Sequence, residues 1–133
     1  KKNFVFNFDQ YSNIKKITKS IEIVYGLRNF IGNANKFSKE TVYISLKSDN
    51  EITEIIIEDD GNGYPRDVLS KIGEPYLKSN NPIEKSKIGL GLGLFIGKTL
   101  LEKNFATINC RNSKTRGGAE VIIKWKNKEL FKI

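Results

Sequence analysis

The spacing of apolar residues predicts helices in several segments of the chain. From about residue 21 to residue 37, apolar residues recur at spacings of three and four, which indicates an amphipathic helix with one face on a sheet. That apolar stripe consists of Val24, Leu27, Ile31 and Ala34. A second helix is predicted to open at the glycine-rich residues 89–94 and to continue to residue 103, and a short one covers residues 67–72.

Segments rich in β-branched and aromatic residues predict strands between these helices. They cover residues 4–8, 41–46, 52–57, 106–111 and 119–125. The polar residues 47–51 suit a hairpin, so the strands on either side of them are expected to pair antiparallel. Helices and strands mix without a strict βαβ repeat. The sequence therefore predicts an α+β fold, a two-layer α/β sandwich with about three helices on one face of a mainly antiparallel mixed sheet of about five strands.

Composition and charge narrow the class of protein. The chain has 133 residues, which is enough for one domain with its own core. It contains no histidine and a single cysteine, Cys110, so an internal disulfide is excluded and zinc or histidine-based catalysis is not expected. The net charge of +8 is scattered along the chain, which does not favour nucleic acid. Because the chain starts at Lys1, we expect residues 1–133 to be a cytoplasmic domain excised from a longer protein.

Glycines mark two places where chemistry is possible. Gly89, Gly91 and Gly93 lie where a polar loop becomes a helix, and small residues there let backbone N–H groups approach a phosphate. A hinge or close helix packing explains the same spacing. No strand directly precedes these glycines and no Gly-Lys-Ser/Thr follows, so dinucleotide and Walker-type sites are disfavoured.

Asp59 ends a predicted strand just before Gly61 and Gly63. Its carboxylate can accept a hydrogen bond from an exocyclic amine, while the glycines leave room for a flat base. When these residues are taken alone, an ordinary turn is the favoured interpretation.

A polar stripe lies on roughly the opposite side of the first helix from its apolar stripe. It consists of Asn29, Asn33 and Lys36, each about one turn after the last. Amide oxygens suit magnesium bound to a nucleotide, and a solvated helix face is the alternative. Gly32, in the same helix, is expected to cost roughly 1 kcal/mol relative to alanine, with no local reason for its presence.

In this order, the features resemble the ATP-binding catalytic domain of bacterial sensor histidine kinases, in the superfamily of gyrase B, heat-shock chaperones and MutL. Residues 25–37 resemble the N box, residues 59–63 the first glycine box and residues 89–94 the second. Residues 73–76 and 93–102 are most similar to RegB/PrrB-type redox-responsive kinases. The hydrolytic members carry a glutamate one turn before the metal-binding asparagine. Asn29 occupies that position here, so the resemblance favours a kinase over a hydrolase.

The resemblance implies the Bergerat ATP-binding fold and a role for each matching residue. Asn33 would ligate Mg²⁺, Asn29 would support the phosphate region, Lys36 would meet phosphate oxygens and Phe37 would lie beside adenine. Asp59 would read the adenine amine. Gly61 and Gly63 would shape the base pocket, and the second glycine box would hold the phosphates through the backbone. The members of that box are Gly89, Gly91, Leu92, Gly93 and Leu94.

The resemblance also implies cofactors and partners. MgATP would donate its γ-phosphoryl group to a histidine on a dimerisation domain of the same protein. The protein would act together with a response regulator. The full-length protein is expected to be a homodimer in the bacterial inner membrane. The fragment is expected to be a monomer that does not bind nucleic acid, and it contains no histidine that could be phosphorylated. Residues 64–88 would form an ATP lid, in which one lysine meets the γ-phosphate: Lys78, Lys85 or Lys87.

Two departures from the family pattern keep a second hypothesis open. The lid has no arginine after Arg66, and Ala119 stands where many members have threonine or serine. The alternative is a degenerate nucleotide-binding fold that only docks protein partners.

Overall fold

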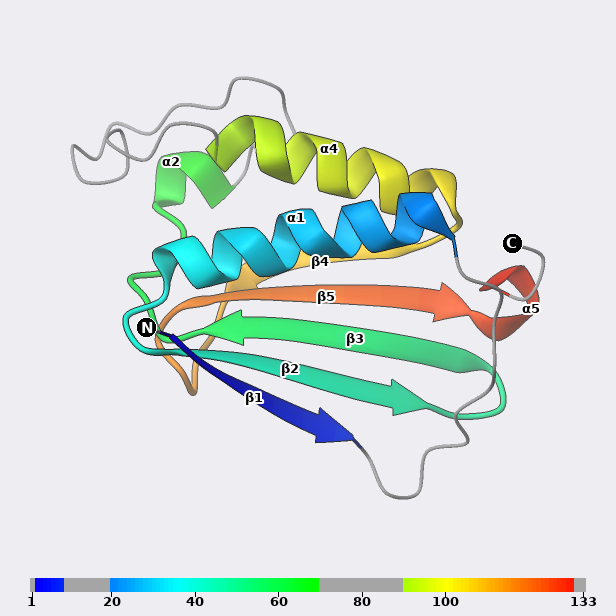
Figure 1. Cartoon of the computed structure of the whole chain (residues 1–133), viewed down its shortest axis with the longest axis horizontal. Helices are drawn as coiled ribbons and strands as arrows, with labels where there is room; N and C mark the ends of the chain where they lie inside the picture. The colour runs from blue at the N-terminus through cyan, green and yellow to red at the C-terminus, as the bar shows by residue number, and fades with distance from the viewer. Residues whose placement is uncertain (1, 9–19, 70–89, 131–133) are drawn as a thin grey trace.

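A five-stranded mixed sheet and two long helices form the two layers of the protein. The computed structural model describes residues 2–8, 20–69 and 90–130. Helices α1 (Ile21–Phe37) and α4 (Leu90–Lys103) lie side by side on one face of the sheet (Figure 1). Two single-turn helices, α2 (Arg66–Leu69) and α5 (Asn127–Leu130), lie near opposite ends of the molecule. The predicted α/β sandwich is confirmed.

The strands lie in the order β1-β2-β3-β5-β4. β1 pairs with β2 in parallel, and every other neighbouring pair is antiparallel, including the predicted β2–β3 hairpin. The parallel pair is possible because α1 follows β1 and precedes β2, as a crossover connection requires. The strand bounds are Asn3–Phe8 for β1, Thr41–Ser48 for β2, Ile52–Asp59 for β3, Thr107–Asn112 for β4 and Ala119–Lys126 for β5.

The buried face of α1 shares Ala34 with the predicted apolar stripe but differs from it at Val24. Its buried residues are Ile23, Gly26, Phe30 and Ala34, whereas Val24 is 36% exposed. Leu27 and Ile31 pack only partly against the core. The prediction for Val24 was wrong because the helix carries apolar residues on two adjoining faces, and only one of them turns toward the sheet and α4.

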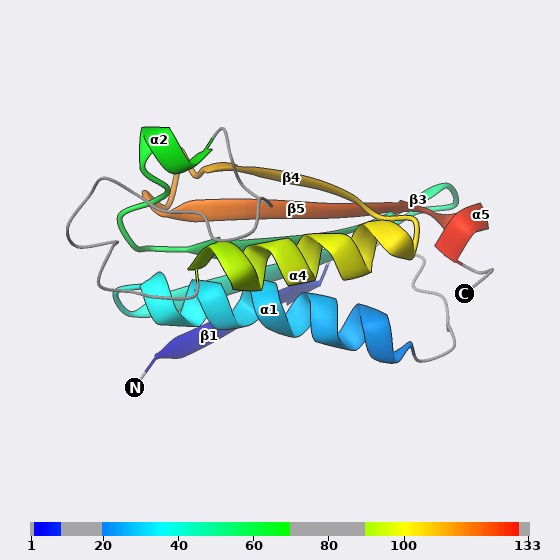
Figure 2. The same ribbon diagram turned by 90° about the horizontal axis from the view of Figure 1, so that it is seen from above.

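Glycines let α1 and α4 approach each other closely. A Cβ at Gly26 of α1 would lie 2.7 Å from Leu101 Cγ, and a Cβ at Gly97 of α4 would lie 2.9 Å from Phe30 Cε2. Side chains at either position would push the helices apart. Seen from above, the two helices cross the sheet together along most of their length (Figure 2). Close packing therefore fixes where α4 begins relative to the end of α1.

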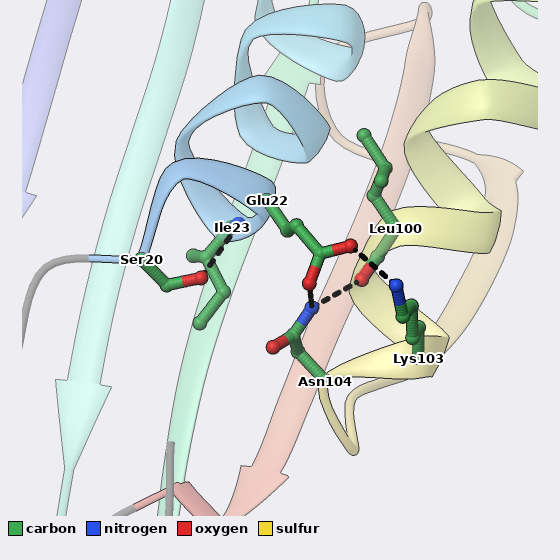
Figure 3. Close-up of polar contacts among 6 residues, drawn as sticks. All are labelled: Ser20, Glu22, Ile23, Leu100, Lys103 and Asn104. Carbon is green, nitrogen blue, oxygen red and sulfur yellow. Dashed lines mark hydrogen bonds and ion pairs between the residues drawn. The ribbon is translucent and has the colours of Figure 1, made fainter.

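Polar contacts join the start of α1 to the end of α4. Ser20 caps α1 by accepting the Ile23 N–H at its hydroxyl oxygen, 3.3 Å away. The Glu22 carboxylate accepts hydrogen bonds from Lys103 Nζ at 2.8 Å and from Asn104 Nδ2 at 3.4 Å (Figure 3). The hydrogen bonds to Lys103 and Asn104 lower the pKa of Glu22. These contacts hold the two helices antiparallel at the end away from the candidate site.

Gly32 is the one glycine of α1 with open space around it. Nothing lies within 4 Å of a Cβ built there, in contrast to Gly26 of the same helix. We expect Gly32→Ala to stabilise the protein by roughly 1 kcal/mol, because alanine loses less backbone entropy in a helix. Gly26→Ala serves as the matched control and is expected to destabilise. Chemical denaturation of both variants checks this, and a loss of stability in Gly32→Ala would contradict it.

Within residues 2–8, 20–69 and 90–130, no helix has the length and apolar character needed to cross a membrane.

Candidate functional site

A cleft is lined by residues from the end of α1, the end of β3 and the start of β5. These ends of the three elements lie on the left in Figure 1. The last turns of α1 form one wall of this cleft through Phe30, Asn33, Ala34 and Phe37. The sheet and the chain that follows β3 supply the remaining lining, which is Ile57, Asp59, Gly63, Tyr64, Pro65, Ala119 and Val121. The cleft is therefore mostly apolar, with a few polar groups, as expected of a small-molecule site.

Asp59 is a buried carboxylate on the floor of the cleft. It is only 3% exposed, and its Oδ1 accepts the N–H groups of Gly61 at 2.8 Å and Ala119 at 3.3 Å. Its Oδ2 has no hydrogen-bond partner among the described residues. Burial raises the pKa of Asp59 above its usual value, and the two backbone hydrogen bonds only partly oppose that effect. Such a group is suited to accept a hydrogen bond from a ligand inside an apolar cleft.

Asp60 points away from Asp59 and ties the loop after α1 to the end of β3. Its carboxylate oxygens accept the backbone N–H groups of Lys39, Glu40 and Thr41 at distances from 2.8 to 3.2 Å. Partial burial acts to raise the pKa of Asp60, but these hydrogen bonds outweigh it, and the pKa is lowered. This clamp holds both chain segments that frame the cleft.

We expect Asp60→Asn to lower the free energy of unfolding by roughly 2 kcal/mol near neutral pH, because hydrogen bonds to a charged acceptor are lost. The folded-state pKa of Asp60 lies below the unfolded value, so its contribution is full above the unfolded pKa. It disappears as the pH falls through the folded pKa. Urea denaturation at neutral and strongly acidic pH measures both effects. The exposed Glu102→Gln is the control, and a difference that persists unchanged in acid would contradict the assignment.

Two asparagines of α1 face the first turns of α4. A Cβ built on Gly93 would lie 3.6 Å from Asn33 Nδ2 and 3.7 Å from Asn29 Oδ1. Asn29 Nδ2 donates to the Tyr25 carbonyl at 2.8 Å, which leaves its oxygen toward α4. Asn33 Nδ2 is buried without a hydrogen-bond partner in the described part of the chain. An orphaned buried amide in this position fits a site completed by a ligand, and its oxygen suits Mg²⁺ bound to a phosphate.

The two glycines after β3 are required by contacts within the protein. A Cβ at Gly61 would lie 2.2 Å from the Phe37 carbonyl oxygen. Gly63 has φ +79°, and a Cβ there would lie 2.7 Å from Asn112 Oδ1. Gly61 therefore brings the chain against the end of α1, and Gly63 turns it toward β4. These contacts shape the cleft even before any ligand enters it.

Tyr64 and Cys110 meet behind the cleft. Burial raises the pKa of Tyr64 well above its usual range and raises the pKa of Cys110 to about 11, so both groups stay protonated at neutral pH. The two side chains lie near each other, and Cys110 packs partly against the core. Cys110 therefore serves as a small, partly buried side chain beside the core.

Several of the predicted site residues are brought together by the structure. Asn33, Phe37, Asp59 and Gly63 line the cleft, and Gly61 lies beside it. Lys36 is exposed, with its ammonium 5.8 Å from the centre of the Phe37 ring. Leu94 is fully buried, so only its backbone can serve a ligand.

The other predicted residues lie at the start of α4 or between α2 and α4. Gly91 and Leu92 lie in the first turn of α4. Gly89, the similarity at residues 73–76 and the candidate lid lysines fall outside the described residues. Those lysines are Lys78, Lys85 and Lys87.

Sequence reasoning missed Asp60, Asn112 and the role of Tyr64. Nothing in their local sequence distinguishes them from turn or strand residues, because each acts through a contact distant along the chain. Asp60 contacts the loop after α1, and Asn112 contacts Tyr64 across 48 residues.

Comparisons with known proteins agree with this geometry. Residues 18–129 match the family model described as "Histidine kinase-, DNA gyrase B-, and HSP90-like ATPase". The chain is 38% identical over 102 residues to the sensor histidine kinase RegB of Cereibacter sphaeroides, which covers 73% of this chain. It spans only 22% of the length of that relative.

Two solved structures share the fold. The mycobacterial sensor histidine kinase MprB superposes with a TM-score of 0.73 at 22% identity, covering 93% of this chain and 82% of that one. Full-length ShkA in complex with AMPPNP superposes with a TM-score of 0.71 at 21% identity, covering 92% of this chain and 25% of that one.

Proposed function

Since the chain belongs to the histidine kinase-, DNA gyrase B- and HSP90-like ATPase family, we propose that it is the ATP-binding catalytic domain of a two-component sensor histidine kinase. The observation that carries this proposal is the convergence of Asn29 and Asn33 of α1 on Gly93 of α4, next to a cleft with Asp59 on its floor. These are the polar groups that a nucleotide needs at its two ends. The adenine would lie in the apolar cleft and the phosphates at the start of α4.

Each end of the nucleotide meets a different kind of group. Asp59 Oδ2 would accept a hydrogen bond from the exocyclic amine of adenine, and Phe37 and Tyr64 would flank the ring. The backbone N–H groups at the first turn of α4 would meet the phosphates. Asn33 would hold Mg²⁺, which supplies positive charge that neutralises the phosphate oxygens. Asn29 would support Asn33 from the same helix face.

The phosphoryl acceptor must come from another domain. This chain has no histidine, so the γ-phosphoryl group would leave the β-phosphate oxygen of ATP and bond to an imidazole nitrogen elsewhere in the protein, with ADP as the other product. The nucleotide domain contributes positioning and charge neutralisation, which supply most of the catalysis in phosphoryl transfer. A dimerisation domain carrying the histidine and a response regulator are the partners that we propose.

Calorimetric titration with AMPPNP, with and without Mg²⁺, tests nucleotide binding directly. We expect saturable binding that is tighter with Mg²⁺, and Asn33→Ala is expected to remove most of the Mg²⁺ dependence. Asn35→Ala, an exposed asparagine of the same helix, is the matched control. Transfer of phosphate to a separately supplied histidine domain then tests the kinase activity. A folded wild-type chain that binds no nucleotide would leave protein docking as the better description.

A further inference from the structure

Asn112, the last residue of β4, holds both polar atoms of the Tyr64 backbone. Its Oδ1 accepts the Tyr64 N–H at 2.6 Å, and its Nδ2 donates to the Tyr64 carbonyl at 3.0 Å. A primary amide can pair with a residue in this way because it carries a donor and an acceptor side by side, as a neighbouring strand does. Two bonds to one residue fix the direction of the chain after Gly63 as well as its position.

The sequence around Tyr64 is adapted to this clamp. Gly63 combines a φ of +79° with a close approach to Asn112, where a Cβ would lie 2.7 Å from Oδ1. Only glycine permits both the backbone conformation and the approach without strain. The glycine that the sequence assigns to the base pocket is thus also the residue that allows the clamp to form.

β4 also contacts the side chain of Tyr64. Tyr64 lines the cleft and packs against the core, and its side chain lies near that of Cys110, which stands two residues before Asn112 on the same strand. One strand therefore contacts both the backbone and the side chain of Tyr64. Asn112 itself is exposed and does not line the cleft, so any effect that it has on a ligand must pass through Tyr64.

We propose that Asn112 is a positioning residue for the base pocket, which acts by holding Tyr64 as the wall against which a purine base packs. This inference rests on the proposed nucleotide-binding function. Without the clamp, the backbone at Tyr64 is free to leave the cleft, and the ring no longer presents a fixed surface to the base. Pre-formed walls increase affinity because less ordering is required when the ligand binds.

Calorimetric titration of the whole chain with ADP tests the proposal. We expect Asn112→Ala to weaken ADP binding by roughly 5- to 10-fold, about the effect of one neutral hydrogen bond, because only part of the lost interaction with Tyr64 passes to the ligand. Asn109→Ala, an exposed asparagine on the opposite face of β4, is the control and is expected to bind as the wild type does. Asn112→Asp keeps the acceptor and loses the donor, so an intermediate affinity is expected. It also replaces the alanine variant as the test if that variant does not fold.

A double-mutant cycle separates positioning from a general loss of structure. If Asn112 acts through Tyr64, ADP binding to the Tyr64→Ala/Asn112→Ala protein is no weaker than binding to Tyr64→Ala alone. Additive losses, or wild-type affinity in Asn112→Ala, would overturn the proposal while leaving nucleotide binding intact. A wild-type chain that binds no ADP would instead overturn the proposed function, and this inference with it.

Discussion

Replacing Asp59 with asparagine is expected to weaken adenine-nucleotide binding by about 10- to 150-fold, because a charge-assisted hydrogen bond is worth roughly 1.5–3 kcal/mol. The substitution is conservative for the fold. The asparagine oxygen can still accept the N–H groups of Gly61 and Ala119, as Oδ1 of Asp59 does. Only the second oxygen, which we propose accepts the adenine amine, is replaced by a donor. Calorimetric titration with AMPPNP measures the loss.

The same substitution is expected to leave stability unchanged or to raise it. Burial raises the pKa of Asp59, so the folded state binds its proton more tightly than the unfolded state. Stability therefore falls as the pH rises from the unfolded pKa to the folded pKa, and the ionised carboxylate carries its full cost above that window. Asparagine has no such cost. The free energy of unfolding of Asp59→Asn at neutral pH should equal or exceed that of the wild type, and any gain should vanish in acid.

Asp49→Asn is the matched control for this experiment. Asp49 lies in the β2–β3 hairpin and, like Asp59, accepts two backbone N–H groups at one carboxylate oxygen, from Glu51 and Ile52. It lies outside the cleft, so its replacement should leave nucleotide binding unchanged. A folded Asp59→Asn protein that binds AMPPNP as tightly as the wild type would remove Asp59 from the base site.

Gly118→Ala is expected to destabilise the protein by roughly 3 kcal/mol, the upper end of the usual range for overpacking. A Cβ at Gly118 would lie 2.2 Å from both the carbonyl oxygen and Oδ1 of Asp59. The backbone of β3 cannot move away without breaking its pairing with β5, which runs through the neighbouring residues Glu58 and Glu120. Nucleotide binding should fall together with stability, because Asp59 is displaced. Urea denaturation and calorimetry measure the two effects.

Gly117→Ala is the control that tests the effect of backbone conformation without steric crowding. Gly117 has φ +83°, but nothing lies within 4 Å of a Cβ built there. Its substitution should cost about 1–2 kcal/mol from the left-handed conformation alone. It should leave the affinity for AMPPNP close to that of the wild type. If the two substitutions weakened AMPPNP binding equally, close contact with Asp59 would not explain why glycine is required at position 118.

Helical periodicity located α1 correctly but only partly identified its buried face, which includes Ala34 of the predicted stripe. Val24 belongs to the predicted apolar stripe and is exposed, whereas Ile23 and Phe30 are buried. Both sets satisfy the spacing of an amphipathic helix, so the pattern alone permits either orientation. Packing decided between them, because Gly26 allows α4 to lie close on one side.

The glycines show the same difference between what a local sequence pattern predicts and what tertiary packing decides. The sequence marked Gly61, Gly63 and Gly93 as places of close approach, and it found no local reason for Gly32. In the structure a Cβ would lie 2.2 Å from the nearest atom at Gly61 and 2.7 Å at Gly63. At Gly93 the nearest atom would be at an ordinary van der Waals distance of 3.6 Å, and Gly32 has open space. A one-dimensional pattern can indicate that a side chain is not tolerated, but it cannot name the atom that excludes it.

The sequence by itself determined the two long helices, the five strands, the fold class and the order of the nucleotide-binding motifs, because these depend on periodicity and turn chemistry among neighbouring residues. The short helix α5 was not predicted. Only the tertiary structure decided which distant residues meet. Ala119 reaches Asp59 across 60 residues, and Asn112 reaches Tyr64 across 48. These contacts follow from the strand order β3-β5-β4 and its register. That arrangement is set by the packing of the whole sheet against α1 and α4, which no local pattern encodes.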